Sequence, residues 1–127
     1  LTNIIRDIKE DFLRGRIYIP IDEIERFGIK EENFGKDAGK TDSFRRLLSF
    51  QIKRSREYYR LSAPGIKYIP GINTRLVIAA MSKMYSAILT RVEQNNYDVF
   101  SKRAVIGYYK KILIIMEVIL KGEYLCR

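Results

Sequence analysis

The sequence contains no histidine and only one cysteine, Cys126, among its 127 residues. A disulfide within the chain is therefore excluded, and a zinc site made of cysteine and histidine is not expected. Nucleophilic catalytic triads lack their usual base. The groups that remain for chemistry are carboxylates, tyrosines and cations, which suit the binding of magnesium and phosphate. Cys126 itself is expected to be a free thiol near the end of the chain.

Long hydrophobic runs are also missing. No apolar run reaches the roughly 18 residues that a membrane-spanning helix needs, and the longest, ILIIMEVIL, is interrupted by Glu117. The hydrophobic content of 46% nevertheless argues against disorder, and the length suits one domain or part of one. The net charge of +9 favours anionic partners, namely phosphates, nucleic acid or an acidic membrane surface, without choosing among them.

Hydrophobic periodicity predicts four main helices, one short helix and no strand, which indicates an all-α fold. The first main helix covers about residues 1–14 and is stopped by Gly15, and a short helix over IDEIERFGI ends near Gly28. The polar stretch KEENFGKDAGKTD is predicted to be a loop.

The remaining helices have candidate start and stop signals. The second main helix is expected to be capped by one of Thr41, Asp42 and Ser43, and the third by Asn73 or Thr74. Because the third helix, up to about Asn95, is apolar over much of its circumference, it should be central and buried. The last helix, AVIGYYKKILIIMEVILK, should end at Gly122.

The opening stretch places three oxygen-bearing side chains on one stripe of the first helix, because residues four apart share a face. These are Asn3, Asp7 and Asp11. Such a stripe could hold Mg²⁺, which prefers one or two carboxylates and takes further ligands from substrate phosphates. Alternatively, the stripe is a solvated face whose acids pair with Lys9, Arg6 and Arg14. Spacing alone leaves both interpretations open.

The longer string NIIRDIKED-FLRG-RIYIP closely resembles the second signature of the squalene/phytoene synthase family. That signature combines an Asn, an Arg-Asp pair, a second acid four residues on and a later Arg-x-aromatic-x-Pro, and every fixed position from Asn3 to Pro20 agrees. The segments TDSFRRLLSFQIKRSREYY and YSAILTRVEQNNYDVFSKRAV also resemble the phytoene synthase branch. The resemblance covers nearly the whole chain but only the second half of a family member.

Two features of the family are absent. The Gly and Gln that precede the signature would lie just upstream of LTN, and the first aspartate-rich motif belongs to the family's N-terminal half. Residues 1–127 are therefore expected to be the C-terminal portion of a single prenyl-synthase domain. The missing N-terminal half is then an expected partner, and the isolated chain is expected to be inactive.

The resemblance implies an isoprenoid-synthase-type helical bundle around an apolar channel. It implies that Asn3, Asp7 and Asp11 hold Mg²⁺, with Mn²⁺ as an alternative, and that Arg6 contacts substrate diphosphate. The family's catalytic residues would correspond to Asp7, Asp11 and Tyr85. For Tyr85, the resemblance places the hydroxyl in the cavity near the diphosphate and the carbocation, whereas the alternative is a core tyrosine with a satisfied hydroxyl.

Three further residues are candidates for substrate binding. Arg16 and Tyr18 either close the diphosphate end or only pack the exit of the first helix. Arg103 either contacts phosphate from a helix start or is a solvated surface charge.

The function implied is that of a prenyltransferase of isoprenoid and carotenoid biosynthesis. It would condense two prenyl diphosphates head to head, geranylgeranyl diphosphate giving phytoene through a cyclopropylcarbinyl diphosphate, with no need for NADPH. The alternatives are hydrolysis to a prenyl alcohol and formation of squalene or dehydrosqualene from farnesyl diphosphate. Nucleic acid is not an expected partner, because no base-reading motif accompanies the charge. Peripheral membrane association is expected to suit such substrates, in the cytoplasm or, for a plant protein, in a plastid.

Overall fold

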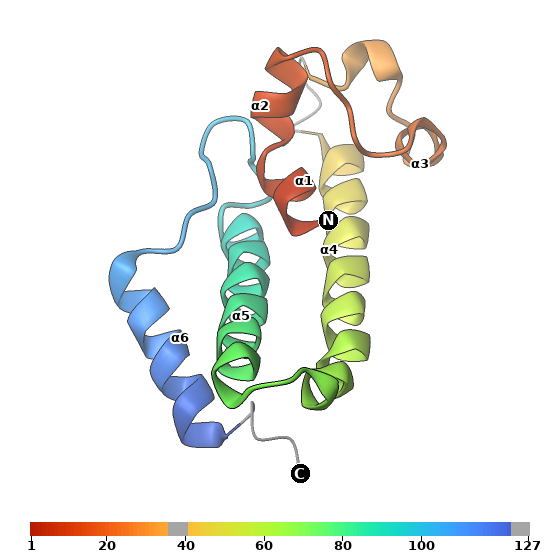
Figure 1. Cartoon of the computed structure of the whole chain (residues 1–127). Coiled ribbons are helices and arrows are strands. Elements are labelled where there is room, and N and C mark those ends of the chain that lie inside the picture. Colours follow the sequence, from red (N-terminus) through yellow and green to blue (C-terminus); the bar gives the residue numbers. More distant parts are fainter. Residues whose placement is uncertain (36–40, 123–127) are drawn as a thin grey trace.

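A computed structural model of the chain describes residues 1–35 and 41–122 (Figure 1). Cys126 and part of the predicted polar loop lie outside the described residues. The helices are α1 (Thr2–Arg6), α2 (Ile8–Leu13), α3 (Ile21–Arg26), α4 (Asp42–Ser62), α5 (Ile72–Gln94) and α6 (Tyr108–Lys121), with the short 3₁₀ helices η1 (Glu31–Asn33) and η3 (Ala63–Tyr68). No strand occurs in the described residues, so the prediction of an all-α fold is confirmed.

Three long helices form the body of the molecule. In Figure 1, α5 lies between α4 and α6, while α1 and α2 lie across the end where α4 begins and α5 ends. α4 begins as predicted, because the Thr41 hydroxyl oxygen accepts a hydrogen bond of 3.2 Å from the backbone amide of Phe44. α4 buries one face at helical spacing, and the buried residues are Phe44, Leu47, Leu48, Gln51, Ile52 and Ser55.

The main core joins α1, α4 and the second half of α5. Ile5, Leu48 and Leu89 are completely buried within it. The Thr2 hydroxyl, which is 4% exposed, lies 2.7 Å from the Tyr59 hydroxyl of α4. Packing and this hydrogen bond together fix α1, which carries Asn3 and Arg6, against the two long helices.

The prediction of one continuous helix over residues 1–14 is wrong at Asp7. This residue has φ −101° and ψ 16°, and it separates α1 from α2. Backbone hydrogen bonds still run from Asp7 to Asn3 (2.8 Å) and from Asp11 to Asp7 (2.9 Å). Aspartate is a poor residue for a helix interior because its carboxylate competes for local partners, and here Arg6, the last residue of α1, and the distant Arg103 hold that carboxylate.

The starts of the last two long helices also differ from the prediction. α5 begins at Ile72 after Gly71, whose φ of 82° suits glycine, rather than at a cap on Asn73 or Thr74. α6 begins at Tyr108 instead of near Ala104, and it ends at Gly122 as predicted. Residues 104–107 are not helical; Ala104 is buried in the core, and Gly107, with φ −65° and ψ 157°, directly precedes α6.

α5 is central, as predicted, but it is not buried on every side. It contacts α1, α4 and α6, whereas Val77 and Met81 are 55% and 49% exposed. The outer face of α6 is apolar and exposed as well, with Leu113 at 60% and Leu120 at 82%. Among the described helices, none combines the length and hydropathy needed to cross a bilayer.

Candidate functional site

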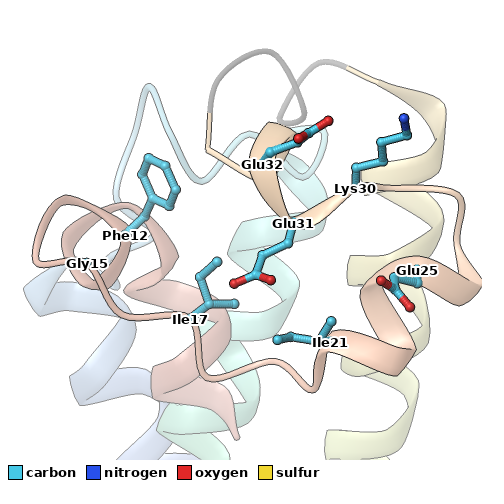
Figure 2. A pocket seen from close by; sticks show the side chains of 8 residues that line it. All are labelled: Phe12, Gly15, Ile17, Ile21, Glu25, Lys30, Glu31 and Glu32. Atoms are coloured by element: carbon cyan, nitrogen blue, oxygen red, sulfur yellow. The ribbon is translucent and has the colours of Figure 1, made fainter.

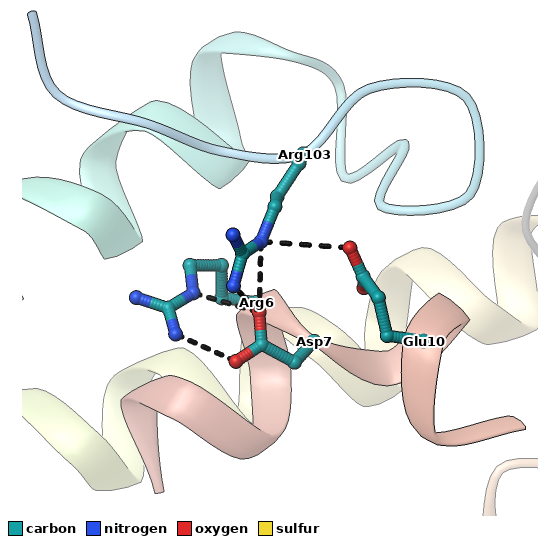
Figure 3. A network of polar contacts seen from close by, with 4 residues as sticks. All are labelled: Arg6, Asp7, Glu10 and Arg103. Atoms are coloured by element: carbon teal, nitrogen blue, oxygen red, sulfur yellow. Dashed lines mark hydrogen bonds and ion pairs between the residues drawn. The ribbon is translucent and has the colours of Figure 1, made fainter. Parts of the chain in front are cut away.

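The side chain of Asp7 lies between two arginines at the break between α1 and α2 (Figure 3). Arg6 donates from Nε to Oδ1 (2.8 Å) and from Nη2 to Oδ2 (2.6 Å). Arg103 donates from Nε and Nη2 to Oδ1, at 3.1 and 2.8 Å. The Nε of Arg103 also lies 3.5 Å from the carboxylate of Glu10. The opening signature and the corner before α6 therefore meet at one ionic cluster.

Electrostatics in this cluster favour the charged forms. The hydrogen bond from Arg6 lowers the pKa of Asp7 below its usual value, with a further contribution from Arg103 that works against desolvation. The same hydrogen bond raises the pKa of Arg6. Asp7 is therefore an anion at neutral pH, as a metal ligand must be.

A cavity of about 230 Å³ adjoins the cluster. Its charged lining residues are Arg6 from α1, Arg103 from the corner before α6 and Lys111 from α6. The rest of the lining is largely apolar and consists of Met84, Tyr85, Ile88, Ala104, Val105 and Ile106. Three cations beside an apolar wall suit a ligand with an anionic head and an apolar body.

Tyr85 is half-buried on α5 and packs against the main core. It lines this cavity together with Arg6, and its charge interaction with Arg6 contributes to the raised pKa of that arginine. The structure thus brings four of the predicted site residues together, namely Arg6, Asp7, Tyr85 and Arg103. The predicted start of a helix at Arg103 is wrong, because Arg103 precedes α6 by several residues.

The other predicted site residues lie elsewhere on the same segment. Asp11, Arg16 and Tyr18 border a recess of only about 10 Å³ between α2 and the non-helical segment that follows it. The backbone amide of Arg16 donates to the Asp11 carbonyl at 2.9 Å, while the side chains of Arg16 and Tyr18 are exposed. Asn3 is exposed one turn before Asp7.

The donor set for a metal is small. Among the described residues, no three His, Cys, Asp or Glu side chains gather closely enough to hold a metal ion by themselves. Asn3, Asp7 and Asp11 offer one amide and two carboxylates along α1 and α2, and both Asp7 oxygens accept hydrogen bonds from arginine. This set fits Mg²⁺, which is commonly held by one or two carboxylates and completed by water and substrate phosphate.

Lys111 is a lining residue that sequence analysis missed. Residues Lys110 and Lys111 are adjacent at the start of α6, and which of them lies at a given cavity depends on where the helix begins. The paired lysines beside the matched Arg103 segment were the available signal.

A larger cavity, of about 890 Å³, lies near α2, α3 and η1 and contains none of the predicted site residues (Figure 2). Glu25, Glu31 and Glu32 line it, and Lys30 is the only cation among its described lining residues. Carboxylates repel a diphosphate, so this cavity does not suit the same ligand.

The chain is similar in sequence to known proteins of one family. The family model described as squalene/phytoene synthase matches residues 1–110. The chain is 41% identical to phytoene synthase of Arthrospira platensis over 91% of its length, and this covers 37% of that protein. It is 36% identical to 15-cis-phytoene synthase of Synechocystis sp., over 98% of the chain and 36% of that protein. For the chloroplastic phytoene synthase 2 of Zea mays the identity is 40%, over 89% of the chain and 28% of that protein. The chain therefore spans about a third of the length of these relatives.

Proposed function

This chain belongs to the squalene/phytoene synthase family, and from that premise we propose that it is the C-terminal portion of a prenyltransferase that condenses two prenyl diphosphates head to head. The proposed substrate is geranylgeranyl diphosphate, and the proposed product is phytoene, formed through a cyclopropylcarbinyl diphosphate. The observation that carries the proposal is the cavity in which Arg6, Arg103 and Lys111 meet Tyr85, next to the anionic Asp7.

Ionisation of an allylic diphosphate is the first step that such a site must promote. The carbon–oxygen bond breaks, the electron pair leaves with the diphosphate, and an allylic cation remains. Arg6, Arg103 and Lys111 line one small cavity, so they can stabilise the charge that develops on the leaving group without reorganising. Bound Mg²⁺, held by Asn3, Asp7 and Asp11, would neutralise further diphosphate charge. No reductant is needed for this product, so NADPH is not part of the proposal.

Apolar and aromatic groups in the same cavity suit the second half of the substrate. Tyr85 lines the cavity together with the cations and with the apolar residues Met84 and Ile88. Its ring can face an allylic cation, because the face of an aromatic ring attracts positive charge. Its charge interaction with Arg6 supports a position near the diphosphate. Tyr85 is accordingly proposed as a catalytic residue.

The relatives contain a further part that this chain does not match. We propose that a corresponding polypeptide is the partner that completes the site. Val77 and Met81 of α5 are about half exposed, although they continue the apolar face that leads from Tyr85. Large exposed apolar surfaces mark contact sites. A second aspartate-rich segment from that partner would supply the carboxylates that the described residues lack.

The setting of the enzyme follows from its ligands. Prenyl diphosphates are amphipathic and their hydrocarbon products partition into lipid, so we place the enzyme at a membrane surface, in the cytoplasm or in a plastid. Several relatives have names that carry the word chloroplastic, among them those of Zea mays and Arabidopsis thaliana.

A chimera tests the proposal. This chain would replace the matching third of the Arthrospira platensis phytoene synthase, and the purified chimera would be incubated with Mg²⁺ and geranylgeranyl diphosphate. We expect phytoene in the extracted product, and loss of about a hundredfold in rate for Arg103→Gln, in line with removal of one charge-stabilising donor. Lys102→Gln, at the adjacent exposed cation, is the matched control.

Each alternative product would contradict the proposal and assign a different reaction. Prenyl alcohol as the sole product would assign hydrolysis instead of condensation. A hydrocarbon formed only from farnesyl diphosphate would assign the squalene or dehydrosqualene reaction. Robust turnover by the 127-residue chain alone would overturn the need for a partner.

A further inference from the structure

A second basic cavity, of about 570 Å³, adjoins the candidate site. It is formed by the end of α5 and the beginning of α6, and its lining residues are Ala87, Thr90, Arg91, Gln94, Val105, Ile106, Gly107 and Lys110. Val105 and Ile106 border both cavities. Of the two adjacent lysines, Lys110 lines this cavity and Lys111 lines the candidate site.

No described residue balances the charge of this cavity. Arg91 and Lys110 come from different helices, and neither forms an ion pair with any residue of the described ranges 1–35 and 41–122. The only acid of α5, Glu93, accepts hydrogen bonds of 2.9 and 2.6 Å from Arg56 of α4. The only acid of α6, Glu117, is bound by Lys83 and Lys121. The carboxylates of both helices are therefore paired with other cations, and Arg91 and Lys110 lie beside one cavity without an acidic partner from α5 or α6.

The remaining lining indicates the chemistry of a ligand. Thr90 and Gln94 can each donate a hydrogen bond from the side chain. Ala87, Val105 and Ile106 add apolar surface. No carboxylate lines the cavity. Cations, neutral donors and an apolar wall together suit a phosphate group that carries an apolar substituent.

We propose that this cavity is a second anion site, which binds the phosphate or diphosphate group of an apolar ester through Arg91 and Lys110. The site differs from the proposed reaction site in its cations, because Arg91 and Lys110 line it whereas Arg6, Arg103 and Lys111 line the other cavity. Its binding therefore does not depend on the proposed condensation. The same phosphate chemistry is offered by a soluble prenyl phosphate and by the headgroup of an anionic phospholipid.

The test follows backbone amides by NMR in the full 127-residue chain, without divalent metal, during titration with inorganic pyrophosphate. We expect the amide signals of Thr90 and Gly107 to shift and saturate. The double variant Arg91→Gln/Lys110→Gln should weaken this response by about tenfold or more, because charge-assisted hydrogen bonds are lost. Arg6→Gln should leave the Thr90 and Gly107 response unchanged. Arg91→Lys, which keeps the positive charge, should retain part of the binding that the double variant loses.

Controls separate loss of the site from loss of the fold. Lys53→Gln/Lys67→Gln removes two exposed cations elsewhere and should leave the Thr90 and Gly107 shifts unaltered, and far-ultraviolet circular dichroism should be the same for every variant. Equal shifts in the chain and in the Arg91/Lys110 variant would overturn the proposal. Shifts confined to the surroundings of Arg6 and Arg103 would do the same.

Two further arms identify the source of the phosphate. Titration with geranyl monophosphate tests a soluble ester, and sedimentation with vesicles of phosphatidylglycerol, against phosphatidylcholine alone, tests a lipid headgroup. Binding that depends on Arg91 and Lys110 in either arm supports the site and names its source. If pyrophosphate, the ester and the anionic vesicles all fail to bind in an Arg91- and Lys110-dependent way, the proposal is wrong.

Discussion

Arg103 and Asp7 are 96 positions apart in the sequence, yet two nitrogens of the Arg103 guanidinium donate to Oδ1 of Asp7 at 3.1 and 2.8 Å. This contact joins the corner before α6 to the break between α1 and α2. Arg6 holds the same carboxylate from the other side. A diphosphate that entered the adjoining cavity would meet guanidinium groups that are already held in place by one anion.

The Arg103–Asp7 contact should stabilise the chain only modestly. Arg103 is about half exposed, at 51%, so we expect a coupling of about 0.2–1 kcal/mol. A double-mutant cycle with Asp7→Asn and Arg103→Gln, followed by urea unfolding, measures it. Lys102→Gln should change the free energy of unfolding by less than about 0.5 kcal/mol. A coupling of zero would mean that the contact does not persist in solution.

The pH dependence of the same carboxylate follows from its lowered pKa. Because the pKa of Asp7 is lower in the folded chain than the ordinary 3.8, the ionised form stabilises the fold above pH 3.8, and this contribution is lost as the pH falls through the folded value. Carbon-detected NMR titration of the Asp7 carboxyl measures the shift. Arg6→Gln should move the pKa back toward 3.8 by more than Arg103→Gln does, since Arg6 is the larger cause. An unshifted value in the unmodified chain would contradict the cluster.

Regular helices could be predicted from the sequence because their cause is local. The apolar residues of α4 recur every three or four positions, and the cap at Thr41 bonds a residue only three positions away. The stop at Gly122 needs only the left-handed φ of 61° at that residue. The break at Asp7 could not be predicted in this way. It coincides with a hydrogen bond from Arg103, and periodicity over residues 1–14 contains no trace of so distant a partner.

The candidate site shows the same division. Arg6 and Asp7 are neighbours in the signature, so their proximity is local, and the family resemblance added Tyr85 and Arg103. Lys111 was missed although the adjacent lysines Lys110 and Lys111 are visible in the sequence, because which of them lines the cavity depends on the start of α6 at Tyr108. The catalytic roles of Asp7, Asp11 and Tyr85 stay predictions.

The hydrogen bond between Thr2 and Tyr59 should anchor α1 to α4. Tyr59→Phe would leave the hydroxyl of Thr2, which is only 4% exposed, without its partner. We expect a loss of about 1–3 kcal/mol in the free energy of unfolding. The neighbouring Tyr58 is 59% exposed, so Tyr58→Phe is the matched control and should be nearly neutral. Adding Thr2→Val to Tyr59→Phe should recover part of the loss, and no recovery would show that the hydroxyl pair is not its cause.

Glu117 should act as an acid-sensitive link between α5 and α6. Its carboxylate lies 3.0 Å from Lys83 Nζ of α5 and 2.6 Å from Lys121 Nζ of its own helix, and the hydrogen bonds from Lys121 and then Lys83 lower its pKa from 4.5 to about 2. The unfolded chain protonates this group near 4.5, so its contribution to stability is present above pH 4.5 and is lost between pH 4.5 and about 2. The protection factors of the α6 amides, which correct the measured exchange rates for the intrinsic pH dependence of exchange, should therefore fall within that interval.

Substitution separates this link from ordinary helix charge. Glu117→Gln should lower the protection factors of the α6 amides at neutral pH and remove their dependence on pH below 4.5. Glu57 provides the comparison, because it is also exposed but pairs with Arg60 inside α4 and joins no second helix. Glu57→Gln should leave α6 unchanged. If both substitutions change the protection factors of α6 equally, or if acid leaves these protection factors unaltered in the unmodified chain, Lys83 and Glu117 do not hold the two helices together.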